Sequence, residues 1–200
     1  EQKEQWYLEK KGEAIIRQES FGRISGFPIA YWISPEMLNA FDSFPLLSSV
    51  AEPRQGLITG DNDRFLREWF EIEANKLNRK WFVYNKGGNY RKWYGNNDLV
   101  VNWENSGNEI VSFVDEKTGK QRSRPQNIRY YFREGFTWTT LSIGAFSARI
   151  MPAGQIFDAK GSSCFAESTN NIKALLALTN SNVSAEFFKI LSPTVDYSAG

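Results

Sequence analysis

The segment RKWFVYNKGGNYRKWYG, from Arg79 to Gly95, opens the part of the chain that decides the fold. It starts with an apolar and aromatic run that is typical of a β-strand, and then reaches a glycine pair that favours a turn. Similar short runs recur as far as Phe165, separated by Gly, Asn and Pro. They are DLVVNW, EIVSFV, IRYYF, FTWTTLSI, FSARIM and QIFDA. The pattern predicts a curved, mixed or antiparallel sheet over residues 80–165, with a hairpin turn at EKTGK in which Gly119 takes a positive φ.

Helices are predicted on both sides of this region. Asp61 is suited to cap a helix over residues 62–77, because apolar residues recur there at spacings of three and four. Residues 170–191 predict a C-terminal helical hairpin, and residues 26–33 predict a strand before a helix that begins at Ser34-Pro35. The predicted fold class is α+β. The hairpin is expected to bury Leu175, Leu176, Leu178, Val183, Phe187, Phe188 and Leu191.

Aromatic residues make up 15% of this 200-residue chain, and seven of them are tryptophan. Large rings supply most of the burial in a core, so we expect the tryptophans of the central region to be largely buried. The expectation covers Trp69, Trp81, Trp103 and Trp138.

Positive charge is concentrated in two segments. Residues 79–95 hold five basic residues and six aromatics with no acid, and residues 117–133 hold six basic residues with no acid, although the net charge is only +1. Basic side chains neutralise phosphates and aromatic faces accept stacked bases, so the composition favours nucleic acid as a partner. A half-buried strand pair with a solvated charged rim would have a similar composition.

Long strings in the chain resemble the C-terminal part of adenine-specific DNA methyltransferases of type IIG restriction-modification systems and of the BREX, PglX-like phage-defence group. The strings cover most of residues 26–197 and occur in the order of the family pattern. They are GFPIAYWIS, PRQGLITGDNDRFLREWFE, KWFVYNKGGNYRKWYGNNDLVVNWENSG, YYFREGFTWTTLSIGAFSARIMPAGQIFDAKG, ALLALTNSNV and LSPTVDY.

In that family, this region is the target-recognition domain, which reads double-stranded DNA while a preceding domain methylates adenine. The resemblance implies a connection from an upstream methyltransferase domain at residues 1–25, a target-recognition domain at 26–168 and a closing helical hairpin at 169–200. The chain opens on Glu1 and stops at Gly200 just after a matched string, so we expect a piece of a longer protein.

Basic residues in turns and polar loops are the expected DNA contacts, since they can anchor phosphates or read base edges. The NKGGN loop can bring its backbone close to DNA because glycine has no side chain, and the loop around Arg122 and Arg124 is rich in Gln and Arg. The candidate DNA-binding residues are Arg64, Lys86, Arg91, Lys92, Arg122, Arg124 and Lys160.

The motifs of catalysis are missing from the sequence. No two prolines are adjacent, so the Asn/Asp-Pro-Pro-aromatic loop of amino-group methyltransferases is absent, and no Gly-rich turn follows an apolar strand. We therefore expect no cofactor in this chain, and S-adenosylmethionine only in the full-length enzyme. The chain has no histidine, which excludes a Ser-His-Asp triad. A lone cysteine, Cys164, and the lack of a long apolar run predict a cytoplasmic protein with no disulfide and no membrane span.

Two other functions remain open. Asp98, Asp115, Glu116 and Lys117 superficially resemble a Mg²⁺-dependent nuclease, in which two carboxylates hold the metal and a lysine orients water. Alternatively, the aromatic residues could form an interface with other subunits of a defence complex. An exposed apolar patch without neighbouring positive charge would favour that interface.

Overall fold

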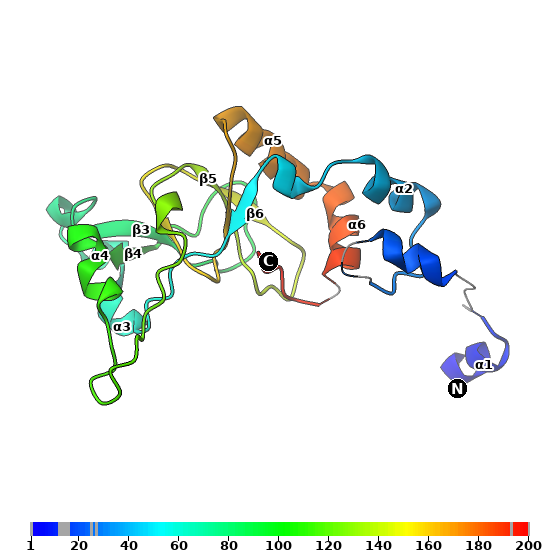
Figure 1. Cartoon of the computed structure of the whole chain (residues 1–200), viewed down its shortest axis with the longest axis horizontal. Helices are drawn as coiled ribbons and strands as arrows, with labels where there is room; N and C mark the ends of the chain where they lie inside the picture. Colours follow the sequence, from blue (N-terminus) through cyan, green and yellow to red (C-terminus); the bar gives the residue numbers. More distant parts are fainter. Residues whose placement is uncertain (1, 12–16, 25, 27, 193, 200) are drawn as a thin grey trace. The chain divides into compact units, whose positions relative to one another are not determined.

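The structure is a computed structural model that describes residues 2–11, 17–24, 26, 28–192 and 194–199. The chain divides into two compact units, Glu1–Leu46 and Leu47–Gly200 (Figure 1). The domain boundaries expected at residues 25 and 168 stay a prediction. Among the described helices, none has the length and apolar composition needed to span a bilayer.

The first unit contains α1 (Gln2–Leu8), the 3₁₀ helix η1 (Gln18–Arg23) and α2 (Pro35–Ser43). As predicted, α2 begins at Ser34, whose hydroxyl accepts a hydrogen bond from the Met37 amide at 3.3 Å. The strand predicted over 26–33 is wrong for the residues described there: Pro28–Ala30 are irregular and a turn follows. Ile29 is exposed and has no partner strand, so its apolar character does not lead to a sheet.

The second unit is built on two four-stranded sheets, which together confirm the α+β class. Sheet one has the order β1 (Glu52–Arg54), β8 (Ser163–Phe165), β5 (Gly135–Trp138) and β6 (Ala148–Met151), and all its pairs are antiparallel. Sheet two has the order β2 (Leu66–Glu68), β4 (Leu99–Asn102), β3 (Trp81–Asn85) and β7 (Ile156–Phe157). Its β3–β7 pair is parallel and its other pairs are antiparallel.

The long helix predicted over 62–77 is wrong beyond its first turn. Asp61 does cap α3 (Asn62–Phe65), and its carboxylate accepts from the Arg64 amide at 3.1 Å. The chain then leaves the helix, because Leu66–Glu68 pair with β4 as strand β2, and only the short helices η3 (Trp69–Glu71) and η4 (Ala74–Lys76) follow. Pairing with the edge of β4 is thus favoured over the helix that the local spacing of apolar residues predicted.

Two predicted strands are also wrong. The first half of the run EIVSFV lies in α4 (Glu104–Val111), and the run IRYYF begins with the 3₁₀ helix η5 (Ile128–Tyr130). The tryptophan prediction is confirmed for Trp103 and Trp138, which are buried, while Trp81 is half-buried. Trp69 contradicts it, because its side chain is 59% exposed on η3, outside the helix that would have buried it.

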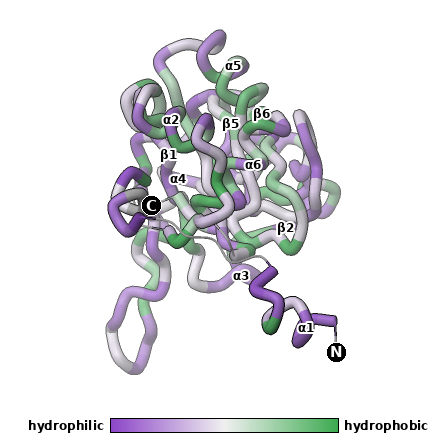
Figure 2. Tube along the Cα trace, turned by 90° about the vertical axis from the view of Figure 1, so that its right-hand side faces the viewer, coloured by the Kyte–Doolittle hydropathy of each residue, from purple (hydrophilic) through white to green (hydrophobic). Residues whose placement is uncertain are grey.

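The C-terminal helical hairpin is confirmed as α5 (Thr169–Thr179) and α6 (Asn182–Leu191), with serine caps at Ser168 and Ser181. Helix α5 packs on β5 and β6, where Ile172 and Leu176 enter the core of sheet one. Figure 2 shows hydrophobic residues gathered where α5 lies beside β6. Because only one face of the hairpin meets the sheet, three residues that were predicted to be buried are about half exposed. They are Leu178, Val183 and Leu191.

Candidate nucleic-acid interface

Two further segments extend sheet two beyond β7. Leu57 pairs in parallel with Asp158, and Ile58 pairs antiparallel with Arg124. The Leu57 amide donates to the Phe157 carbonyl at 2.8 Å, and the Arg124 amide donates to the Ile58 carbonyl at 2.7 Å. The hydrogen-bonded order therefore continues as β3, β7, residues 57–58 and residues 122–124.

The directions of these segments bring basic residues to one edge. Strand β3, strand β7 and residues 57–58 run in parallel, so the chain leaves all three at the same edge, through Lys86, Lys160 and Gly60. The antiparallel segment enters from that edge at Arg122, whose carbonyl lies 2.6 Å from the position of a Cβ built on Gly60. Neighbouring strands are about 4.8 Å apart, so four segments span roughly 15 Å, close to the ~12 Å width of a DNA major groove.

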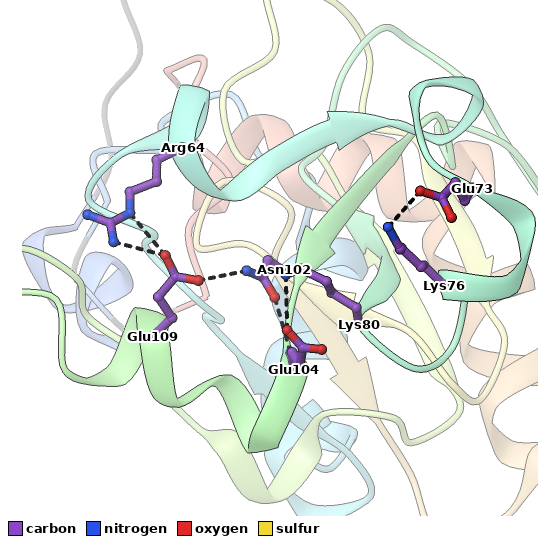
Figure 3. Close-up of polar contacts among 7 residues, drawn as sticks. All are labelled: Arg64, Glu73, Lys76, Lys80, Asn102, Glu104 and Glu109. Carbon is purple, nitrogen blue, oxygen red and sulfur yellow. Dashed lines mark hydrogen bonds and ion pairs between the residues drawn. The ribbon is translucent and has the colours of Figure 1, made fainter.

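The Phe113 ring contacts both Arg122 of this edge and a fourth basic residue, Arg64. The guanidinium carbons of Arg64 and Arg122 each lie 5.0 Å from the centroid of the Phe113 ring. We call Lys86, Lys160, Arg122 and Arg64 the basic edge. Arg64 also forms an ion pair with Glu109 at 2.9 Å, and this carboxylate accepts in turn from Asn102 (Figure 3). The Arg64 guanidinium is thus held in place but partly neutralised, whereas no ion pair of Arg122 is seen within the described residues.

The predicted hairpin turn beside Arg122 is confirmed. Val114 and Gln121 form an antiparallel bridge, and Gly119 has a φ of 66°. The turn is the green loop that projects beyond α3 and α4 in Figure 1, and Figure 2 shows a long projecting loop with many hydrophilic residues. Arg124 lies after it on the strand-like segment, with an exposed side chain.

Arg91 and Lys92 do not lie at the basic edge. They follow the glycine pair on a loop that crosses to sheet one, where Trp93 bridges to Arg149 of β6. The Lys92 ammonium donates to the Asn180 carbonyl at 2.8 Å, at the C-terminal end of α5. A cation there complements the helix dipole, so Lys92 is committed to a structural contact. Arg91 is exposed.

Two charged side chains are buried beneath these loops. Asp158 accepts from the Tyr84 hydroxyl at 2.7 Å and from the Lys160 amide at 2.6 Å. Burial raises the pKa of the Asp158 carboxyl, and the hydrogen bond from Tyr84 opposes that rise. Arg149 is 1% exposed and forms no ion pair with a carboxylate in the part of the chain that the structure describes. Burial lowers its pKa to about 10, with a smaller contribution from Arg91.

A second arginine cluster was missed from the sequence. The guanidinium carbons of Arg54, Arg129 and Arg133 lie 5.3, 5.0 and 5.1 Å from the ring centroid of Tyr130. Glu52 hydrogen-bonds both Arg54 and the Tyr130 hydroxyl. The second basic segment contains Arg129 and Arg133, which was a usable signal, but nothing local indicated that Arg54 would join them across the fold.

Neither the acidic residues of the nuclease alternative nor the single cysteine is arranged as a reactive group. Among the described residues, no group of three His, Cys, Asp or Glu side chains is placed to hold a metal ion. The Asp115 carboxylate is engaged by its own turn, where hydrogen bonds from Thr118 hold its pKa below the ordinary value. Cys164 is buried, and burial raises the pKa of its thiol to about 12.

The chain is similar in sequence to parts of known proteins. It is 42% identical over 196 residues to the adenine-specific methyltransferase PglX of Lacticaseibacillus casei (strain Zhang). The chain is similar to part of an adenine-specific methyltransferase. A second relative, the adenine-specific methyltransferase BrxX of Escherichia coli O9:H4 (strain HS), is 38% identical over 192 residues.

Each match covers 92% of this chain but only 16% of PglX and 15% of BrxX. The chain thus spans about a sixth of the length of the curated relatives it matches. No known protein-family profile matches it. The similarity supports the family resemblance drawn from the sequence.

Proposed function

We propose that this chain is the sequence-reading region of an adenine-specific (N6) DNA methyltransferase of a restriction-modification or BREX-type phage-defence system. It binds double-stranded DNA along the basic edge and presents the target to a methyltransferase domain of the same longer protein. The observation that carries the proposal is the meeting of Lys86, Lys160 and Arg122 from three separate segments at one edge. The similarity to two adenine-specific methyltransferases makes DNA the matching partner.

In this arrangement, some basic residues are suited to contact phosphates and others are suited to read bases. Lysines act as point charges, so Lys86 and Lys160 are suited to anchor phosphates and set the register. Arg122 and Arg124 flank Ser123, which is buried and donates to the Ile110 carbonyl, so both guanidinium groups are carried by a supported backbone. A bidentate arginine contact to guanine is the commonest specific base contact, and supported side chains are suited to make one.

Methyl transfer belongs to the rest of the longer protein in this proposal. The chain lacks the Pro-Pro-aromatic loop and the cofactor glycine turn, so it is non-catalytic and does not bind S-adenosylmethionine. When the 200-residue chain is titrated with S-adenosylmethionine in a calorimeter, no saturable heat of binding is expected. Stoichiometric binding would contradict this part of the proposal.

Duplex binding at several salt concentrations tests the basic edge. The triple variant Lys86→Gln, Lys160→Gln, Arg122→Gln is expected to bind duplex DNA more weakly, because it removes positive charges that contact phosphates. Each lost phosphate contact also reduces the slope of log affinity against log salt by about 0.9. The matched control is Lys189→Gln, which removes an exposed lysine on α6 that pairs with Glu186. An unchanged slope in the triple variant, with the control also unchanged, would overturn the proposed surface.

Methylation in the longer protein tests base reading. If Arg122 or Arg124 reads a guanine, alanine at that position costs about 1–3 kcal/mol at one base pair, so the methylated motif relaxes there alone. If the residue contacts a phosphate, methylation falls evenly across all sites. Sequencing the methylated sites of both single variants distinguishes the two roles, and wild-type motif and rate in both would exclude this loop.

One observation favours a protein-interaction face as a second function. Trp69 and Phe70 on η3 are 59% and 68% exposed and lie edge-to-face, with a ring separation of 5.9 Å. Glu68 and Glu71 flank them in the sequence, so the residues directly next to this aromatic pair are acidic and not basic. Serine at both aromatic positions is expected to abolish co-purification of the longer protein with other defence-system subunits while leaving duplex affinity intact. Unchanged co-purification would exclude this face.

A further inference from the structure

The loop between the glycine pair and β4 exposes three aromatic side chains. Tyr90, Trp93 and Tyr94 are 56%, 53% and 65% exposed. Tyrosine and tryptophan usually contribute large buried areas, and elsewhere in this unit Trp103, Trp138 and Tyr84 do so. Three exposed rings thus lie within five consecutive residues, and packing of the chain does not explain their exposure.

Trp93 is also held in an unfavourable backbone conformation. Its φ is +76°, in the left-handed region that glycine occupies freely and that costs another residue roughly 1–2 kcal/mol. Two hydrogen bonds to β6 impose this conformation. The Trp93 amide donates to the Ala148 carbonyl, and the Ile150 amide donates to the Trp93 carbonyl, both at 2.9 Å. A bulky residue that persists at such a position indicates a use for its side chain.

The surroundings of the three rings are cationic. Arg91 is exposed within the same loop, and the buried Arg149 guanidinium lies 3.5 Å from the Arg91 carbonyl. Lys92 reaches the end of α5. None of these three cations forms an ion pair with a carboxylate within the described residues. Exposed aromatic faces beside the exposed Arg91 guanidinium match the chemistry of a nucleobase attached to a phosphate.

We propose that Tyr90, Trp93 and Tyr94 form a stacking platform for a DNA base that is not paired within a duplex, with Trp93 as its central ring. This rests on the proposed DNA-binding function, and it adds a second surface with a different ligand class. The basic edge contacts the phosphates and groove of paired DNA, whereas the platform contacts the face of an unpaired base. Stacking tolerates any base, so the platform adds affinity without selecting a sequence.

Trp93→Gly tests the platform without a folding ambiguity, because glycine adopts a φ of +76° freely. The 200-residue chain is titrated with a fully paired duplex, with the same duplex carrying one unpaired adenine, and with a single strand. Loss of one stack is expected to weaken binding to the unpaired-base duplex and to the single strand roughly 5- to 150-fold. Affinity for the paired duplex stays within twofold, and the urea midpoint stays level or rises.

Matched variants and a direct probe complete the test. Trp69→Ala removes an equally exposed tryptophan outside the loop and leaves all three affinities unchanged. Tyr94→Ser weakens unpaired-base binding in the same direction as Trp93→Gly. The fluorescence of 2-aminopurine at the unpaired position is quenched by the wild-type chain and recovers with Trp93→Gly.

Two results would overturn the inference. If Trp93→Gly leaves unpaired-base affinity unchanged, or lowers paired and unpaired affinities equally, the rings are not a stacking platform although DNA binding itself survives. If the wild-type chain binds none of the three DNAs, the proposed function fails and the platform fails with it.

Discussion

Replacing Phe113 with leucine tests whether one ring organises the basic edge. Leucine keeps most of the apolar volume of this half-buried side chain but removes the aromatic face. Two guanidinium groups lie 5.0 Å from the ring, and each exposed cation–π contact contributes about 0.5–1 kcal/mol. The edge-to-face pair with Phe65, at 5.2 Å, contributes about 0.5–1.5 kcal/mol more. Phe113→Leu is therefore expected to lower the free energy of unfolding by about 1.5–3.5 kcal/mol.

The assay is urea unfolding followed by tryptophan fluorescence, repeated in a chain that carries both Arg64→Met and Arg122→Met. In that background the cation–π contacts no longer exist, so the cost of Phe113→Leu should shrink by about 1–2 kcal/mol. Duplex affinity of the single variant should also fall, because both guanidinium groups become free to reorient. The reasoning is refuted if the cost is equal in both backgrounds, or if Phe113→Leu binds duplex DNA as tightly as the wild type.

Three further outcomes are expected. Gly60→Ala should destabilise the chain more than Gly119→Ala when unfolding is compared, because both have positive φ but only a Cβ at Gly60 meets backbone, 2.6 Å from the Arg122 carbonyl. Lys92→Met should lower the unfolding free energy by about 0.5–1.5 kcal/mol and leave the salt dependence of duplex binding unchanged, since its ammonium caps α5. The pKa of Asp158 is raised in the fold, so its contribution to stability is fully present below the unfolded pKa and is lost as pH rises through the folded pKa. Asp158→Asn should therefore gain stability relative to wild type as pH rises above the ordinary carboxyl pKa in pH-dependent urea titrations, and a pH-independent difference would contradict this.

Local sequence signals predicted the structure correctly where it depends only on contacts between residues close together in the sequence. Ser34 and Asp61 each cap the helix predicted to begin there, because a cap joins residues only three positions apart. The hairpin turn at Gly119 followed from the same short-range logic. The same local signals failed at Leu66–Glu68, where pairing with a strand more than 30 residues away in the sequence replaced the predicted helix. Local spacing contains no information about whether a sheet edge will be free.

The sequence by itself determined that positive charge and aromatic rings are concentrated in two segments, and that long strings resemble adenine-specific methyltransferases. Only the tertiary structure decided which of those residues meet. Parallel pairing brought Lys86 and Lys160 to one edge, and Arg122 joined them from an antiparallel segment. The same folding sent Lys92 to the end of α5 and held Trp93 exposed at a positive φ. The physical reason is that charge and ring content belong to residues, whereas position at an edge depends on hydrogen bonds between segments far apart in the chain.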